Sequence, residues 1–334
     1  MVNIVCLSVF HFTLISIFLL TKSKMMSKFH VKTPLLNASA IRPSLFFKLE
    51  NLQQSGSFKD RGIGHMIYTL HEKGDMKKLI SSSGGNAGHA VATVGQQLKI
   101  PVDVYVPITT KSMMVDKLKA RGANVLVGGE NWNAADVMAR KALDEEEGAY
   151  YIPPYDNPLI WEGHSSIIDE LQEQGVRPDC VVVSVGGGGL LCGVQQGLER
   201  LGWMSTRIVA VETEGAASFA AAKKAGSVVS LPHITSLASS LGALSVTPAT
   251  LSSPIHTHSL TVSDNEAVAA CTRFANENLM LVEPACGAAL AAVYSDSHWS
   301  NVVKTNENDV IVLITCGGSV VSLDLLQQWQ RDCL

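Results

Sequence analysis

The sequence has 334 residues, of which 46% are hydrophobic and 17% are charged, and its formal net charge is −4. This composition excludes a disordered chain, which combines low hydrophobicity with high charge, and the length predicts two domains or one large α/β domain. The chain has no basic excess, so we expect no nucleic-acid partner.

Seven cysteines are spread along the chain, and no two of them have CxxC spacing. None lies in a cluster of cysteine and histidine that is typical of zinc. A disulfide framework is uncommon in a chain this long and apolar, so the cysteines favour a reducing compartment and we expect a cytoplasmic protein. The cysteines are Cys6, Cys180, Cys192, Cys271, Cys286, Cys316 and Cys333.

Residues 1–24 form an apolar N-terminal extension that we do not assign to the core. Residues 1–20 contain no Lys, Arg, Asp or Glu, and a segment of about 20 apolar residues is just long enough to span a bilayer. No cation precedes it, so the n-region of a signal peptide is missing. We favour a translated extension upstream of a start at Met25 or Met26. The alternatives are a signal anchor, with the rest of the chain in the cytosol, and a cleaved signal.

From about residue 78 onward, short β-branched runs alternate with helical patterns. The runs are nearly continuous in apolar residues, which is typical of parallel strands buried on both faces. Strand, Gly-rich turn and helix in repetition indicate βαβ units. No linker divides the chain, so we expect one lobe to be inserted in the other. Strands are predicted at residues 78–81, 102–107, 124–127, 180–185, 208–211 and 310–315, and helices at residues 113–120, 132–143, 191–201, 265–277 and 285–294.

A lysine stands among small residues in the segment SGSFKDRG, residues 55–62. Gly and Ser let this backbone fold tightly, and the amine of Lys59 is expected to be partly shielded from water. Desolvation disfavours the ammonium form and lowers the pKa, as a lysine that forms a Schiff base requires. Taken alone, the segment also fits a surface lysine in a polar loop.

The segment SSGGNAGH, residues 82–89, directly follows a predicted strand and leads into a helix. The first turn of a helix leaves backbone N–H groups unpaired, and such a terminus binds a phosphate or a carboxylate. The side chain of Asn86 adds a directed donor and acceptor. An ordinary strand-to-helix turn capped by Ser or Asn explains the same residues equally well.

Four consecutive glycines, residues 186–189, follow the most apolar strand and open another helix. They let the backbone approach a phosphate closely, and the helix dipole favours the anion. The pattern is neither the dinucleotide fingerprint nor a Walker A loop. A flexible glycine turn is the alternative, although such a run costs conformational entropy.

Together these segments indicate a reactive lysine, a phosphate site and a carboxylate site in one α/β chain. Pyridoxal phosphate acting on an amino acid requires these three features.

From about residue 30 to the C-terminus, the chain resembles the fold-type II pyridoxal-phosphate enzymes. It is most similar to their serine dehydratase and threonine deaminase branch, which includes a serine dehydratase-like paralogue. The resemblance implies an α/β protein with two lobes, open and largely parallel sheets, flanking helices and the cofactor in the cleft between the lobes. The matching stretches, in chain order, are HVKTPLL, SGSFKDRGIGH, SSGGNAG, YIPPYDNPLIWEGH, SVGGGGLLCGV, VEPACGAALAAVYS and CGGSVVSL.

The resemblance assigns roles to individual residues. Lys59 is the catalytic residue and bonds the cofactor covalently, while Phe58 packs against the cofactor ring. Asn86 bonds the ring hydroxyl, and Cys316 faces the pyridine nitrogen. The cofactor phosphate is assigned to Gly186, Gly187, Gly188 and Gly189, and the substrate carboxylate to Ser83, Gly84, Asn86 and Ala87.

A thiol at position 316 has chemical consequences if that role holds. It is a weak, neutral partner that leaves the ring nitrogen largely unprotonated, which favours prompt loss of a β-substituent over a long-lived carbanion. Without the resemblance, Cys316 fits a small buried hydrophobe.

The resemblance implies β-elimination, which converts L-serine to pyruvate and ammonia and L-threonine to 2-oxobutanoate and ammonia. It also implies a homodimer with a role in amino-acid catabolism and gluconeogenesis. The large cofactor-binding lobe is expected to comprise residues 25–63 and 157–334, and the small lobe residues 64–156. The alternatives are a racemase, a β-replacement synthase, or a paralogue that binds the cofactor with little turnover.

The family also binds a monovalent cation near the phosphate loop. By match to the family, the carboxylate of Glu212 and backbone carbonyls form an oxygen cage that suits a hard cation such as K⁺. The alternative for Glu212 is that it caps a helix or pairs on the surface. The proposed ligands are Gly186, Glu212, Ala216, Leu241 and Ala243.

Two positions depart from the expected pattern. Gly84 has no side chain where racemase relatives place a serine that protonates the second face of the ring, so we expect no meaningful racemisation and favour the paralogue. Asp60 follows the lysine, where we expect a more neutral residue, and we interpret it as a solvent-facing acid that pairs with Arg61. Glu283 before Pro284 indicates the start of a helix rather than a catalytic acid.

Overall fold

The computed structural model describes residues 29–304 and 306–333. The expectations for residues 1–24 and for a start at Met25 or Met26 therefore lie outside the described residues. Within the described part of the chain, no helix is both long and apolar enough to cross a membrane.

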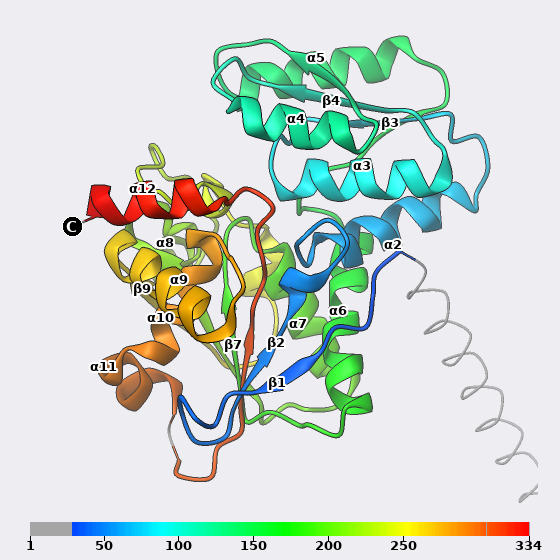
Figure 1. Ribbon diagram of the computed structural model, residues 1–334. Helices are drawn as coiled ribbons and strands as arrows, with labels where there is room; N and C mark the ends of the chain where they lie inside the picture. The colour runs from blue at the N-terminus through cyan, green and yellow to red at the C-terminus, as the bar shows by residue number, and fades with distance from the viewer. Residues whose placement is uncertain (1–28, 305, 334) are drawn as a thin grey trace, which may run out of the picture.

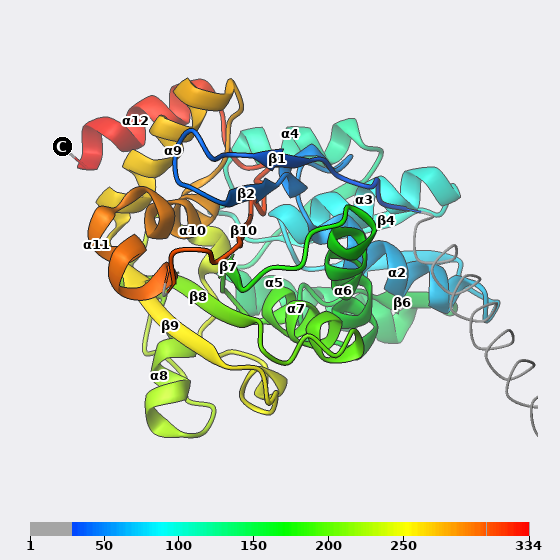
Figure 2. The same ribbon diagram turned by 90° about the horizontal axis from the view of Figure 1, so that it is seen from below.

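A six-stranded sheet forms the larger half of the molecule, with its strands side by side in Figure 2. Its two central strands, β7 and β10, are buried along their whole length, as the apolar runs predicted. Every pair is parallel except β1 with β2. The order is β1 (Leu35–Asn37), β2 (Leu45–Lys48), β10 (Ile311–Ile314), β7 (Cys180–Ser184), β8 (Arg207–Thr213) and β9 (Thr257–Val262).

A separate four-stranded parallel sheet lies in the upper part of Figure 1. Its order is β5 (Asn124–Val127), β4 (Val102–Val106), β3 (Lys78–Ser81) and β6 (Ala149–Tyr151). It is accompanied by α3 (Asn86–Leu98), α4 (Ser112–Ala120) and α5 (Trp132–Glu145). All four strands come from the range expected for the small lobe, whose boundaries at residues 64 and 156 stay predictions.

Helices cover both faces of the larger sheet, with α9 and α10 on one side and α6 and α7 on the other in Figure 1. Helix α10, rich in Ala, is buried from Pro284 to Val293. The helices outside the small sheet are α2 (Lys59–His71), α6 (Pro158–Glu173), α7 (Gly189–Arg200), α8 (Ser218–Ala225), α9 (Asp264–Asn278), α10 (Pro284–Tyr294), α11 (Asp296–His298) and α12 (Leu323–Cys333). Short turns of other helix types are η1 (Glu50–Leu52), η2 (Glu214–Ala216), η3 (Ser239–Leu241), η4 (Pro248–Leu251) and η5 (Trp299–Val303).

Each sheet has its own hydrophobic core. The larger core joins the central strands to α7, α9 and α10. The second core joins β3 and β4 to α3, and also takes Ile63 from α2 and Ile160 from α6. Helix α2 therefore starts at the larger sheet and packs against the smaller one, which places its first residue, Lys59, where the two halves meet.

Candidate active site

Backbone pairing places Lys59 beside Cys316. The segment before α2 runs against the segment that follows β10, with an antiparallel bridge between Ser57 and Gly317. The Phe58 N–H donates to the Cys316 carbonyl at 3.2 Å, and the Gly318 N–H donates to the Gly56 carbonyl at 3.0 Å. Gly317 and Gly318 have φ of 101° and 145°, which only glycine adopts without strain. Two stretches matched separately to the family thus form one wall of the site.

The amine of Lys59 lies in a largely dry environment. Burial lowers its pKa to about 8, although the nearby Cys316 and Glu283 act in the opposite direction. The amine donates to the Pro154 carbonyl at 2.5 Å, in the segment that follows β6. A pKa this close to neutrality leaves part of the population as free amine, which is the form that attacks an aldehyde or accepts a proton.

Asp60 corrects one expectation, because it neither faces solvent nor pairs with Arg61. Its side chain is fully buried and accepts the Ser55 N–H at 2.8 Å. Burial raises the pKa of Asp60 to about 6. The sequence suggested an exposed acid because acidic residues are rarely buried; here the tight turn at residues 55–60 folds the carboxylate back onto its own backbone.

Arg61 instead anchors the first turn of α2 through a buried ion-pair cluster. Its guanidinium contacts Glu50 at 2.6 Å and Glu170 at 2.7 Å, and Glu170 also accepts from Lys48 at 2.6 Å. These four side chains are at most 9% exposed. Removing one partner of a buried pair costs about 3–5 kcal/mol, so this cluster fixes the start of α2 and with it the position of Lys59.

The N-terminus of α3 provides the second wall. Asn86 is the first residue of α3, and Gly85 precedes it in an extended conformation. The carbonyl of Ser83 approaches Gly88 so closely that a Cβ there would lie 1.7 Å from the oxygen, so only glycine permits this tight turn. The turn points the first N–H groups of α3 away from the body of the helix, as anion binding requires.

The tetraglycine loop, residues 186–189, is packed against its surroundings. A Cβ on Gly187 would lie 2.4 Å from the ring of Tyr155, and one on Gly188 would lie 2.4 Å from Thr250. Gly188 also has φ of 93° and caps α7. The hydroxyl of Thr247 beside this loop is buried and has no hydrogen-bond partner among the described residues. A glycine loop at the start of a helix, with an unpartnered hydroxyl beside it, fits the phosphate of pyridoxal phosphate.

Cys316 is buried beside a second thiol. A hydrogen bond with Cys286, followed by burial, raises the pKa of the Cys316 thiol well above its usual range. It therefore stays neutral at physiological pH, which agrees with the weak partner expected for the ring nitrogen.

Two further predicted positions lie close to this centre. The Phe58 ring contacts the buried His164 imidazole in a tilted arrangement with centroids 4.8 Å apart, and the Lys59 amine lies 5.1 Å from the Phe58 ring centroid. Gly84 is bordered by Val106 and Thr110, whose side-chain carbons would lie 3.1 and 3.2 Å from a Cβ.

Glu283 belongs to the site although the sequence interpretation treated it only as the start of a helix. Its backbone does precede α10, but its side chain makes no cap. The carboxylate instead accepts from the Asn86 amide at 2.7 Å. The signal that could have found it is a glutamate directly before an almost entirely apolar helix, where no surface is available to it.

Glu212 is buried at the end of β8, and both of its carboxylate oxygens accept backbone N–H groups. Oε1 accepts from Phe219 at 2.7 Å and Oε2 from Ala220 at 2.8 Å, in the first turn of α8. The helix-cap alternative for Glu212 is thus present in the structure. Leu241 lies next to Gly186, as a cage would need, but the cation set as a whole remains a prediction.

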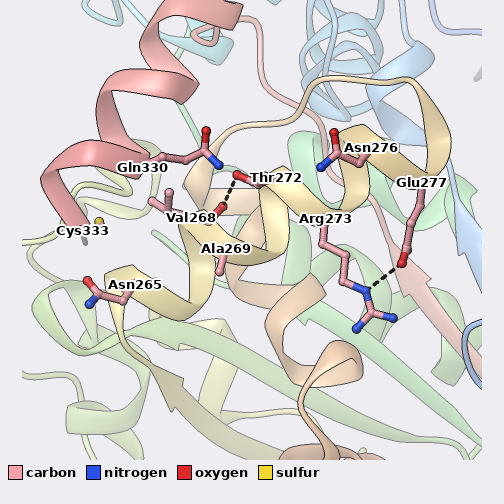
Figure 3. Close-up of a pocket in the computed structure, with 9 residues that line it drawn as sticks. All are labelled: Asn265, Val268, Ala269, Thr272, Arg273, Asn276, Glu277, Gln330 and Cys333. Carbon is pink, nitrogen blue, oxygen red and sulfur yellow. Dashed lines mark hydrogen bonds and ion pairs between the residues drawn. The ribbon is translucent and has the colours of Figure 1, made fainter.

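A surface groove of about 540 Å³ lies elsewhere, between α9 and α12 (Figure 3). Asn265, Arg273 and Gln330 are among the residues that line it, and none of the predicted site residues does. It is therefore separate from the centre around Lys59.

Comparison with known proteins points to one family. The profile of the family described as pyridoxal-phosphate dependent enzyme matches residues 26–317. The chain is 45% identical to the L-serine dehydratase/L-threonine deaminase of Homo sapiens, over 89% of this chain and 94% of that protein. It is 45% identical to the serine dehydratase-like protein of Mus musculus, over 90% and 94%. The crystal structure of a fungal L-serine ammonia-lyase from Rhizomucor miehei is 34% identical, with a TM-score of 0.85, over 92% of this chain and 99% of that one.

Proposed function

Because this chain belongs to the family of pyridoxal-phosphate-dependent enzymes, we propose that it is a lyase that deaminates L-serine to pyruvate and L-threonine to 2-oxobutanoate, releasing ammonia. One observation carries the proposal: the buried amine of Lys59 lies beside the neutral thiol of Cys316 and near Glu283, which accepts from Asn86. The relatives named as serine dehydratase and threonine deaminase support the choice of reaction.

One set of residues in the site binds the cofactor, and another binds the substrate. The tetraglycine loop and Thr247 hold the cofactor phosphate, and Lys59 holds the cofactor covalently. The N-terminus of α3, with Ser83, Gly84 and Ala87, holds the substrate carboxylate, because unpaired N–H groups and the helix dipole both favour an anion there. Phe58 packs against the ring.

Lys59 is the residue that transfers the proton at the substrate Cα. Bound pyridoxal phosphate supplies the electron sink that stabilises negative charge at Cα. The Lys59 amine in its free-base form would accept the Cα proton, and a pKa of about 8 suits a base that works near neutral pH. Gly84 has no side chain to return a proton from the opposite face, so elimination is favoured over racemisation.

The proposal also includes location, assembly, metabolic role and a bound cation. Cytoplasmic location, a homodimer and a role in amino-acid catabolism and gluconeogenesis follow from the resemblance. A K⁺ ion bound by Gly186, Glu212, Ala216, Leu241 and Ala243 is supported by the adjacency of Gly186 and Leu241. Burial also raises the pKa of Glu212 to about 7, and a bound cation would relieve that cost.

The test combines a spectrum with an assay. The purified full chain is loaded with pyridoxal phosphate, its visible absorption is recorded, and keto-acid formation is measured with L-serine and L-threonine. A band of covalently bound cofactor together with pyruvate and 2-oxobutanoate is expected. A band without keto acid would reject the lyase in favour of a cofactor-binding paralogue, and D-serine as the main product would favour a racemase.

A further inference from the structure

The carboxyl group of Glu283 is held at one oxygen and left without a partner at the other. The side chain is 2% exposed, and its Oε1 accepts the Asn86 amide at 2.7 Å. Its Oε2 is buried without a hydrogen-bond partner among the described residues. An unpaired buried carboxylate oxygen is costly, so an oxygen kept in this state needs an explanation.

The orientation of Asn86 makes the contact with Glu283 unambiguous. The Ser319 N–H donates to Asn86 Oδ1 at 2.8 Å, and a backbone N–H is always a donor, so Oδ1 is the acceptor. The Nδ2 group must then face Glu283. The second Nδ2 hydrogen has only a long contact of 3.4 Å, to the hydroxyl of Ser240. Asn86 therefore has one firmly held hydrogen and one that is weakly held.

Glu283 lies near two lysines that come from different elements. Lys59 from α2 and Lys117 from α4 are the cations that act on it, and Glu283 in turn acts on the thiol of Cys316. The Gly318 backbone presses on it so closely that a Cβ there would lie 2.4 Å from the Glu283 side chain. The carboxyl group is thus unable to swing away from Asn86 without moving the loop that follows β10.

We propose that Glu283 is a titrating positioning residue for the cofactor ring: through Oε1 it orients Asn86 so that the weakly held N–H is available to the ring hydroxyl, and through Oε2 it gains or loses the proton that sets the charge beside that contact. The inference rests on the proposed function only for the binding of pyridoxal phosphate by Lys59 and Asn86. It does not depend on which amino acid is the substrate.

The electrostatics of the site support this role. Burial raises the pKa of Glu283 to about 7, while Ser240, Asn86, Lys117 and Lys59 each act to lower it. Near neutral pH the carboxyl group is therefore present in both forms. The charged form stabilises a positive charge on the nitrogen of Lys59, and the neutral form does not, so the absorption of the bound cofactor is expected to depend on pH.

The experiment is a pH titration of the visible spectrum of the cofactor-loaded protein without substrate. Wild type is expected to show a transition centred near pH 7. Glu283→Gln keeps an acceptor for Asn86, so it should retain the cofactor while losing the transition. Glu283→Ala leaves the Asn86 donor unpaired and should weaken cofactor binding on the order of tenfold. Glu277→Gln, which removes an exposed carboxylate on α9 that pairs with Arg273, is the matched control.

A second variant keeps the carboxyl group and shifts its titration. The Ser240 hydroxyl stabilises the charged form of Glu283, so Ser240→Ala should move the transition to higher pH. This variant also serves if Glu283→Gln fails to fold. A wild type without a transition, a Glu283→Gln protein that titrates like wild type, or a Ser240→Ala protein with an unmoved midpoint would each overturn the inference. If the expected titrations appear but no keto acid forms from L-serine, the proposed reaction fails and the inference stands.

Discussion

The turn after β7 and the turn after β3 have the same strand–turn–helix design, yet they are held in different ways. The tetraglycine loop after β7 packs tightly against Thr247 and Thr250 and against the ring of Tyr155, which follows β6 of the small sheet. The turn after β3 has space around Gly85, and its main anchors are two hydrogen bonds of Asn86, which accepts from the Ser319 N–H and donates to Glu283. Close packing cannot be undone locally, whereas a few hydrogen bonds can be exchanged.

We infer from this difference that the tetraglycine loop is rigid and that the turn after β3 can move. The phosphate side is built into the core, while the carboxylate side is attached to the large half through Asn86 and through Lys117, which donates to the Ser319 carbonyl at 2.5 Å. We propose that substrate carboxylate at the N-terminus of α3 draws the small lobe onto the ring and excludes water. Structures with cofactor alone and with a serine analogue test this, because an unchanged position of Asn86 relative to the tetraglycine loop would contradict it.

The largest effect is expected from a change at Lys59. Lys59→Ala should abolish both covalent cofactor and elimination, because no other described lysine has a pKa lowered by comparable burial beside Cys316. Borohydride reduction followed by mass analysis of the protein measures the covalent cofactor. A variant that still yields the reduced adduct would show that another lysine carries the cofactor.

The packing difference predicts unequal responses to the same small substitution. Gly188→Ala combines a φ of 93° with a contact of 2.4 Å to Thr250, so it should lower the free energy of unfolding by about 1–3 kcal/mol. Gly85→Ala meets nothing closer than 3.9 Å and should change it by less than about 1 kcal/mol. Denaturant unfolding of the two variants measures both changes in the free energy of unfolding. Equal losses would contradict the difference in packing between the two turns.

The attachment of the small lobe to the large half is tested by removing the Lys117 amine, which donates to it. Lys117→Met loses the contacts with the Ser319 and Val321 carbonyls. Because Lys117 is only partly buried, we expect substrate binding to weaken by about 1 kcal/mol, which raises KM about fivefold. Lys119→Met, on the exposed side of α4, is the control. Steady-state kinetics with L-serine measures both, and a KM equal to that of the control would show that this contact does not hold the lobes together.

The smallest effect concerns the choice of product. Gly84→Ser places a hydroxyl on the second face of the site, although Val106 and Thr110 must give way slightly because their carbons lie 3.1 and 3.2 Å from the new Cβ. We expect a trace of D-serine from L-serine in this variant and none above background in wild type. Chiral chromatography measures it. Racemisation by wild type at a rate near that of pyruvate formation would refute the role given to Gly84.

The regular strands could be predicted because a run of consecutive apolar residues indicates a buried strand. The run at residues 180–185 is apolar on both faces, and it forms β7 almost as predicted. Strand β9 (Thr257–Val262) and helix α6 were not predicted. The first is a half-polar edge strand, and the second carries buried His164, Ser166 and Glu170, which interrupt the apolar period.

The sequence by itself determined the alternating α/β organisation, the family, and the segments that carry the lysine, the two anion-binding turns and Cys316. These features depend on residues that are adjacent in the chain, since strand burial, glycine conformation and helix starts are local properties. The partners of buried polar groups became clear only from the three-dimensional structure. Arg61 pairs with Glu50 and Glu170 rather than Asp60, and Glu283 contacts Asn86, which lies 197 positions earlier in the chain. Such charges are desolvated by elements distant in sequence, and no local pattern records which of them will meet.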